Sequence, residues 1–201
     1  MKLIGMLDSP YVRRVAISMR LLGLPFEHAA ISVFRGYAEF RQINPVVKAP
    51  TLICDDGTVL MDSTLMLEYL EALSAPRSLM PREPVALAAC EKSAQIVYER
   101  ALRPVEKRHA PWVERVTEQL LAAYAALEAE LAARPLNATE AGLGQASLTA
   151  AVSWTFTQTV LAEQVPAAGF PHLVAHAAAV EALPVFQAIP FDDAVTLPAT
   201  R

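Results

Sequence analysis

The sequence is poor in cysteine. Its 201 residues include only Cys54 and Cys90, which lie far apart and outside any Cys-x-x-Cys motif. A disulfide framework, a structural zinc site or a dithiol redox centre needs more cysteines, or cysteines and histidines at short spacing. The composition therefore argues against all three, and both thiols are expected to be free and at least half-buried.

The sequence also has no long run of lysines or arginines, and its formal net charge is −4. A nucleic-acid footprint is therefore not expected. The apolar stretch at the N-terminus is too short for a signal peptide. Residues 141–162 carry no charge, but they contain too many Ser, Thr and Gln side chains to lie in lipid. We expect a protein-buried helix there, no membrane association and a cytoplasmic location.

Two other kinds of site lack support. The chain has no Gly-x-Ser-x-Gly elbow, so a Ser-His-Asp hydrolase is disfavoured. His172 and His176 have the i, i+4 spacing of metal ligands, but no third ligand is near them in the sequence. We therefore expect no metal.

The first eighty residues alternate between strand and helix patterns. Short β-prone runs indicate strands, and apolar residues at helical spacing indicate amphipathic helices. The predicted order β-α-β-α-β-β-α has strands at 2–6 and 26–33, a hairpin at 51–60, and helices at 10–23, 37–43 and 63–73. A strand–helix–strand start requires a parallel pair, and the hairpin adds an antiparallel edge.

The rest of the chain has only helical patterns. Three prolines in 74–84 mark a linker, and alanine- and leucine-rich segments follow at 85–108, 112–133, 147–162 and 171–182. The predicted architecture is an α/β domain over 1–75, a linker over 76–84 and an all-α domain over 85–201.

Three motifs of the first domain occur at fixed places in this order: Ser9-Pro10 at a strand-to-helix turn, Pro50 before the hairpin, and Asp62-Ser63 at a helix start. With the element order, they resemble the soluble glutathione transferases over essentially the whole chain. The match is to a bacterial-like, serine-type member. The resemblance implies a thioredoxin-like first domain that binds glutathione as co-substrate.

The resemblance also implies roles for individual residues. Ala49 is expected to pair its backbone with the cysteinyl part of glutathione, before a cis bond to Pro50. Asp62 and Ser63 are expected to hold the γ-glutamyl end, with Ser63 also capping its helix. Lys48 is either a partner for a glutathione carboxylate or an ordinary solvated lysine.

Ser9 is predicted both to cap the first helix and to donate its hydroxyl proton to the glutathione sulfur. A helix N-terminus and a donated hydrogen bond both favour the thiolate, which is the nucleophile. Tyr11 is expected to point elsewhere. Arg13 and Arg14 add positive charge to this helix, although at least one is expected to be simply solvated or salt-bridged.

The helical domain is expected to contribute to the pocket for the second substrate. By location, the candidates are Phe34, Tyr98, Arg103, His109 and Trp112. Relatives usually open their buried helix with a Ser/Thr followed three residues later by Asp, but here Ser147 is followed by Ala150. The reciprocal capping bond is therefore expected to be missing.

The function that the resemblance implies is conjugation of glutathione to an electrophilic small molecule, as in detoxification, by a homodimer. Two alternatives remain open. The same fold could serve as a non-catalytic glutathione-binding or protein-interaction member, or as a glutathione-dependent peroxidase, dehalogenase or isomerase. The isomerase branch usually has a Ser-Ser-Cys run at the first turn, which is absent from the stretch LDSPYV.

Overall fold

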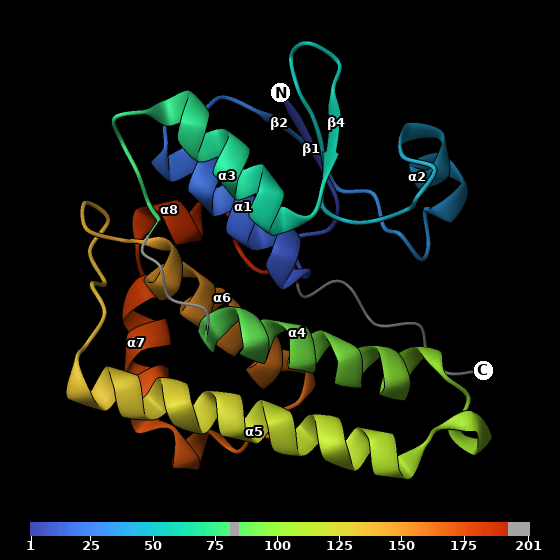
Figure 1. Ribbon diagram of the computed structural model, residues 1–201, viewed down its shortest axis with the longest axis vertical. Coiled ribbons are helices and arrows are strands. Elements are labelled where there is room, and N and C mark those ends of the chain that lie inside the picture. The colour runs from blue at the N-terminus through green and yellow to red at the C-terminus, as the bar shows by residue number, and fades with distance from the viewer. Residues whose placement is uncertain (81–84, 193–201) are drawn as a thin grey trace. The chain divides into compact units, whose positions relative to one another are not determined.

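The computed structural model describes residues 1–80 and 85–192, and these form two compact units (Figure 1). The first unit comprises Met1–Met80 together with Leu183–Asp192. The described part of the second unit runs from Val85 to Ala182. Residues 81–84 of the predicted linker and 193–201 of the predicted helical domain lie outside the described residues.

The first unit has the predicted element order. Its elements are β1 (Lys2–Ile4), α1 (Pro10–Leu21), β2 (Glu27–Ala29), α2 (Tyr37–Ile43), β3 (Thr51–Ile53), β4 (Val59–Met61) and α3 (Ser63–Ser74). The sheet order is β2-β1-β3-β4, with β1 parallel to β2 and the other pairs antiparallel. The predicted thioredoxin-like topology is confirmed.

The core of the first unit lies between the sheet and the pair α1–α3. The two helices lie side by side in Figure 1 and contact each other, and each also contacts a strand. Leu3 and Ile4 of β1 are fully buried, as are Val12, Val15 and Met19 of α1. Burial of several such side chains, at about 1.5–3 kcal/mol each, fixes α1 on the sheet.

The second unit is helical over its described residues. Its elements are α4 (Val85–Val97), a π-helical turn (Tyr98–Leu102), a 3-10 turn (Val105–Lys107), α5 (Ala110–Ala133), α6 (Gln145–Val160), a 3-10 turn (Ala167–Gly169) and α7 (Pro171–Glu181). The predicted continuous helix over 85–108 is wrong. Arg103 is extended with ψ 131°, because the ring of Pro104 disfavours helical backbone in the residue before it.

A buried polar cluster lies inside the second unit. The Thr157 hydroxyl lies 2.7 Å from the Ser93 hydroxyl and 2.6 Å from Tyr124 Oη, which also donates to the Ser153 carbonyl at 3.1 Å. The Tyr124 ring meets Trp154 edge-on at 5.2 Å between centroids. Burial raises the pKa of Tyr124 above its ordinary value, so the phenol stays a neutral donor.

The predicted domain boundaries and the observed units differ at the end of the described chain. Helix α8 (Pro184–Gln187) lies in Leu183–Asp192, which belongs to the first unit and contacts α1. None of the helices in residues 1–80 and 85–192 is long and apolar enough to cross a membrane.

Candidate functional site

Ser9 occupies the turn between β1 and α1. Its backbone is extended at φ −71° and ψ 120°, and its Oγ accepts a long hydrogen bond of 3.5 Å from the Val12 N–H. Pro10 follows at the first helical position, where no N–H is required. The predicted cap is confirmed, and the Ser9 hydroxyl proton is not used in this cap.

The turn that carries Ser9 lies against the loop that precedes β3. Gly5 follows β1 and has a φ of 139°. A Cβ added there would lie 2.6 Å from Val12 Cγ2 and 3.3 Å from Ala49 Cβ. Only glycine permits this close approach. The Ser9 turn and the Ala49-Pro50 loop are therefore neighbours in space, as the predicted site requires.

A small hydrogen-bond network holds the loop before β3. The Ala49-Pro50 bond is cis, which confirms the implied isomer. Buried Asn44 donates to Thr51 Oγ1 at 2.9 Å, and Thr51 Oγ1 donates to the Lys48 carbonyl at 2.7 Å. Neither Asn44 nor Thr51 was predicted as a site residue, although their hydrogen bonds hold this loop.

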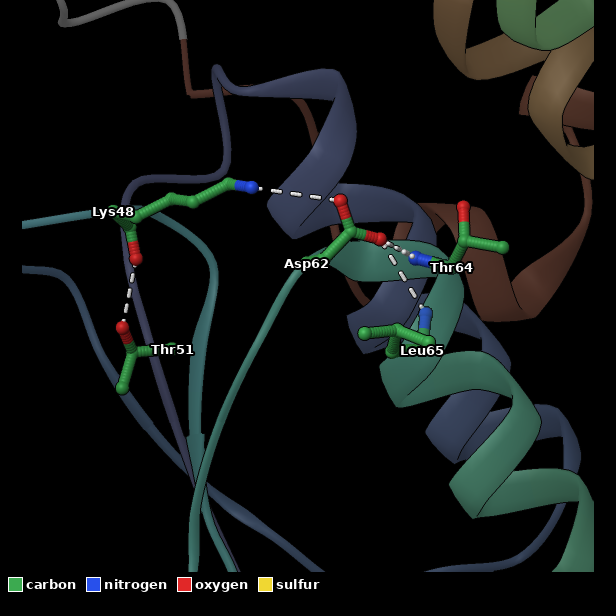
Figure 2. A network of polar contacts seen from close by, with 5 residues as sticks. All are labelled: Lys48, Thr51, Asp62, Thr64 and Leu65. Carbon is green, nitrogen blue, oxygen red and sulfur yellow. Dashed lines mark hydrogen bonds and ion pairs between the residues drawn. The ribbon is translucent and has the colours of Figure 1, made fainter. Parts of the chain in front are cut away.

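Asp62, rather than Ser63, caps α3. Figure 2 shows Asp62 Oδ1 accepting from the N–H groups of Thr64 at 2.9 Å and Leu65 at 3.4 Å. Ser63 is the first helical residue and is buried, so its predicted capping role is wrong. The reason is the backbone of Asp62, whose φ of 79° directs its carboxylate across the open N–H groups.

The other carboxylate oxygen of Asp62 faces Lys48. The Lys48 Nζ lies 3.5 Å from Asp62 Oδ2, across two turns that are distant in sequence (Figure 2). Burial raises the pKa of Asp62, but the N–H groups of Thr64 and Leu65 and the Lys48 charge outweigh it, so the pKa lies below its usual value. A cation and an anion thus stand side by side at the edge of the site.

The pKa of Asp8, the residue before Ser9, is shifted upward, opposite to that of Asp62. Burial raises the pKa of Asp8 to about 6. The negative charge of Asp192 acts in the same direction, whereas the Ser9 N–H and the Arg35 charge act against it. Asp8 was not predicted as a site residue, and no local pattern indicates its burial.

Arg13 and Arg14 of α1 are not solvated, in contrast to the exposed Arg20 at the far end of the helix. Arg13 is 1% exposed and Arg14 is 3% exposed. The Arg13 Nε donates to the Ile189 carbonyl at 3.0 Å, and its guanidinium carbon lies 5.4 Å from the Phe186 ring centroid. Arg13 is therefore directed to the C-terminal end of the first unit.

Three of the predicted pocket residues come together within the second unit. A cavity of about 410 Å3 is lined by Gln95, Tyr98, Glu99, Leu102, Arg103, Pro104 and Trp112. Glu99 is buried; it pairs with Arg103 Nε at 2.9 Å and accepts from the His109 N–H at 3.1 Å. Phe34 belongs to the first unit and is exposed. Its predicted place in the pocket stays a prediction.

Helix α6 begins before Ser147, so this serine does not cap it. Gly144 is the N-cap and makes no side-chain bond, in line with the expectation that the reciprocal capping bond is missing. The Ser147 Oγ instead donates to the Asn137 carbonyl at 2.7 Å, and His176 Nε2 of α7 lies 3.2 Å from both Ser147 Oγ and the Ser147 carbonyl. A chain of polar contacts thus replaces the capping box.

The described residues contain no cluster of three His, Cys, Asp or Glu side chains that could hold a metal ion. The site itself presents the Ser9 hydroxyl, the Lys48–Asp62 charge pair and the N-termini of α1 and α3. Those groups suit a ligand with a thiol at one point and an ammonium and a carboxylate at another.

The chain is similar in sequence to known glutathione S-transferases and GST-like proteins. Residues 3–78 match the family model of the glutathione S-transferase N-terminal domain. YibF, an uncharacterized GST-like protein of Escherichia coli K12, is 27% identical over 124 residues, 60% of this chain and 61% of that protein. Glutathione S-transferase U4 of Arabidopsis thaliana is 30% identical over 99 residues, 49% of this chain and 44% of that protein. The matches therefore span about half the length of these curated relatives.

The fold also agrees with solved structures over nearly the whole chain. A glutathione S-transferase of Methylobacterium radiotolerans, crystallised with glutathione sulfonate, has a TM-score of 0.82 at 24% identity and covers 97% of each chain. The fold is thus a thioredoxin-like domain joined to a helical one. The family match thus covers residues 3–78, as a glutathione S-transferase N-terminal domain, and the likeness over the whole chain is one of fold.

Proposed function

We propose that this protein binds glutathione in its first unit and conjugates the thiol to an electrophilic small molecule. The observation that carries the proposal is the convergence of three turns: the Ser9 cap, the Ala49-Pro50 loop beside it, and the Lys48–Asp62 pair. The similar structure crystallised with glutathione sulfonate supports it.

Each part of the tripeptide has a complementary group in the first unit. The α-amine of the γ-glutamyl end suits the Asp62 carboxylate, and its carboxylate suits Lys48 and the N-terminus of α3 beside Ser63. The existing Lys48–Asp62 contact supports this assignment, because a zwitterion can insert between two opposite charges and keep both neutralised. The Ala49 backbone, which is half-buried beside Gly5, pairs with the cysteinyl segment.

Ser9 acts on the sulfur. Its lone pair accepts the Val12 N–H, while its O–H proton donates to the thiolate that forms when the glutathione thiol releases its proton to solvent. The thiolate then attacks the electrophilic carbon, a C–S bond forms, and the leaving group departs with its bonding electrons. Ser9 stays hydrogen-bonded and never becomes covalently attached, which distinguishes it from a hydrolase serine.

We propose that the cavity beside Tyr98, Arg103 and Trp112 receives the apolar part of the electrophile. Its two aromatic side chains are half-exposed and can stack on a planar substrate. Phe34 remains a further candidate from the first unit. The active form is a homodimer, and measurement of the molecular mass in solution tests this.

The decisive experiment compares wild type with Ser9→Ala. Thiolate absorbance titrated against pH gives the pKa of bound glutathione, and a panel of electrophiles gives turnover. We expect Ser9→Ala to raise the thiol pKa and lower turnover while glutathione still binds. Retention on immobilised glutathione without turnover by wild type favours the non-catalytic alternative. An unchanged thiol pKa in Ser9→Ala would refute the role of Ser9.

A further inference from the structure

Arg13 is a buried cation with two contacts to a distant part of the chain. Its side chain is 1% exposed, although it lies in the first turn of the helix that Ser9 caps. Its Nε donates to the Ile189 carbonyl at 3.0 Å, and its guanidinium carbon lies 5.4 Å from the Phe186 ring centroid. A positive charge is retained in such a place only when its contacts are well formed.

Both contacts belong to Leu183–Asp192, which we call the C-terminal strap. The strap is packed rather than loosely attached, because Val185, Phe186 and Ile189 are all buried. A planar guanidinium can donate from its edge to a carbonyl and place its face on a ring at the same time. A lysine ammonium, a point charge on a flexible stem, does not reproduce both contacts.

Arg13 is also joined directly to Ser9. The Arg13 backbone N–H donates to the Ser9 carbonyl at 2.9 Å, and the Ser9 Oγ accepts from the neighbouring Val12 N–H. At the other end of the strap, the Asp192 charge acts on Asp8, the residue before Ser9. The strap therefore contacts Arg13, which follows Ser9, and its Asp192 charge acts on Asp8, which precedes Ser9.

We propose that Arg13 is a positioning residue: through its contacts with the strap, it holds the first turn of α1 in the geometry in which Ser9 meets the glutathione sulfur. This inference rests on the proposed function. It differs from a purely electrostatic role, in which any cation at position 13 stabilises the thiolate. In the positioning role, the shape of the guanidinium matters as well as its charge.

The test uses one variant on each side of the contact. Arg13→Lys keeps the charge but cannot make the carbonyl bond and the stacking contact together, and Phe186→Leu removes the ring from the strap. Arg20→Lys is the matched control, because Arg20 stacks on Phe26 at 5.6 Å from the exposed far end of the same helix. Turnover is measured against glutathione concentration, and thiolate absorbance is titrated against pH.

We expect Arg13→Lys and Phe186→Leu each to lower kcat by about tenfold to a hundredfold, the loss typical of a misplaced catalytic group. Both should raise the pKa of bound glutathione, leave KM within about twofold, and combine without further loss, because both break the same contact. Arg20→Lys should match wild type. Unchanged kcat and thiol pKa in Arg13→Lys, or independent losses in the double variant, overturn the inference.

A ligand-free measurement separates this inference from the proposed function. Hydrogen exchange of the Val12 and Arg13 amides reports on the first turn of α1 without glutathione. We expect faster exchange in Phe186→Leu and unchanged exchange in Arg20→Lys. If wild type fails to bind glutathione, the proposed function fails; if exchange in Phe186→Leu equals that of wild type, the strap does not hold this turn.

Discussion

Glu128 of α5 closes the N-terminus of α7 through His172. Its Oε1 accepts from the His172 backbone N–H and from His172 Nδ1, both at 2.8 Å, and its Oε2 accepts from the Leu173 N–H at 2.9 Å. Burial raises the pKa of Glu128, but these hydrogen bonds outweigh it and hold the pKa below its usual value. One helix of the second unit thus caps another.

Removal of this carboxylate should destabilise the helical unit. Glu128→Ala leaves the first N–H groups of α7 without their acceptor, and we expect a loss of about 1 kcal/mol, as for other lost caps. Chemical denaturation followed by circular dichroism measures it. Glu130→Ala changes an exposed glutamate of the same helix and should have little effect. Equal stabilities of the two variants would contradict the cap.

Ser9→Asp should separate capping from thiolate stabilisation. Aspartate caps a helix as well as serine, so the free energy of unfolding should stay within about 0.5 kcal/mol of wild type. Its carboxylate has no proton to donate and repels a thiolate. We therefore expect a raised pKa of bound glutathione and a fall in kcat of about a hundredfold. Ser9→Thr keeps the hydroxyl and should retain activity. Full activity of Ser9→Asp would show that Ser9 only caps the helix.

Asp62→Asn should weaken glutathione binding without unfolding the helix start. Asparagine caps as well as aspartate and tolerates the positive φ of this position. Loss of a charged hydrogen bond to the α-amine should raise the Kd for glutathione by about tenfold or more. Isothermal titration calorimetry measures the Kd. Asp56→Asn, in the exposed hairpin turn, is the control, and an unchanged Kd in Asp62→Asn counts against the assignment.

His176 should make the helical unit less stable in mild acid. Burial lowers the pKa of His176 below its usual 6.5, although its contact with Ser147 acts in the other direction. Below about pH 6.5 the unfolded chain takes up a proton that the folded chain resists, so stability falls with falling pH. Urea midpoints between neutral pH and about pH 5 should shift less in His176→Gln than in wild type. His109→Gln, on an exposed residue, should keep the wild-type shift.

Asp8 should have the opposite pH dependence in the first unit. Its pKa is about 6 in the folded chain and 3.8 in an ordinary environment, so its contribution to stability is fully present below about pH 3.8. It is lost as pH rises through about 6, because the unfolded chain then ionises more readily. Asp8→Asn should be more stable than wild type at neutral pH and nearly equal in acid. A pH-independent difference would contradict this reading.

The order of elements in the first unit could be predicted because each element carries its own local signal. Period-two and helical patterns, the hairpin turn and Pro10 all act within a few residues. Cap identity at α3 was predicted wrongly because Asp and Ser rank alike as caps, and only the backbone of Asp62 decides between them. The predicted helix over 85–108 was too long, because Pro104 disfavours helical backbone at Arg103.

The supporting residues of the site could not be predicted in the same way. Asn44 is the C-cap of α2 and Thr51 begins β3, so no pattern within a single element links them. Arg13 and Ile189 are 176 positions apart, so no local pattern indicates that a charged residue of an amphipathic helix will be buried. Such contacts depend on the tertiary fold, and sequence periodicity carries no record of them.

Because the C-terminal strap packs on α1, the first unit cannot complete its contacts until the strap has been synthesised. The ribosome releases the strands and helices of the first unit early, yet the acceptor for Arg13 and the ring beneath it are translated more than 170 codons later. At a synthesis rate of about 5–20 residues per second, Arg13 lacks these contacts for on the order of ten seconds or more. Messages truncated before codon 183 should therefore yield a first unit with increased protease sensitivity at α1.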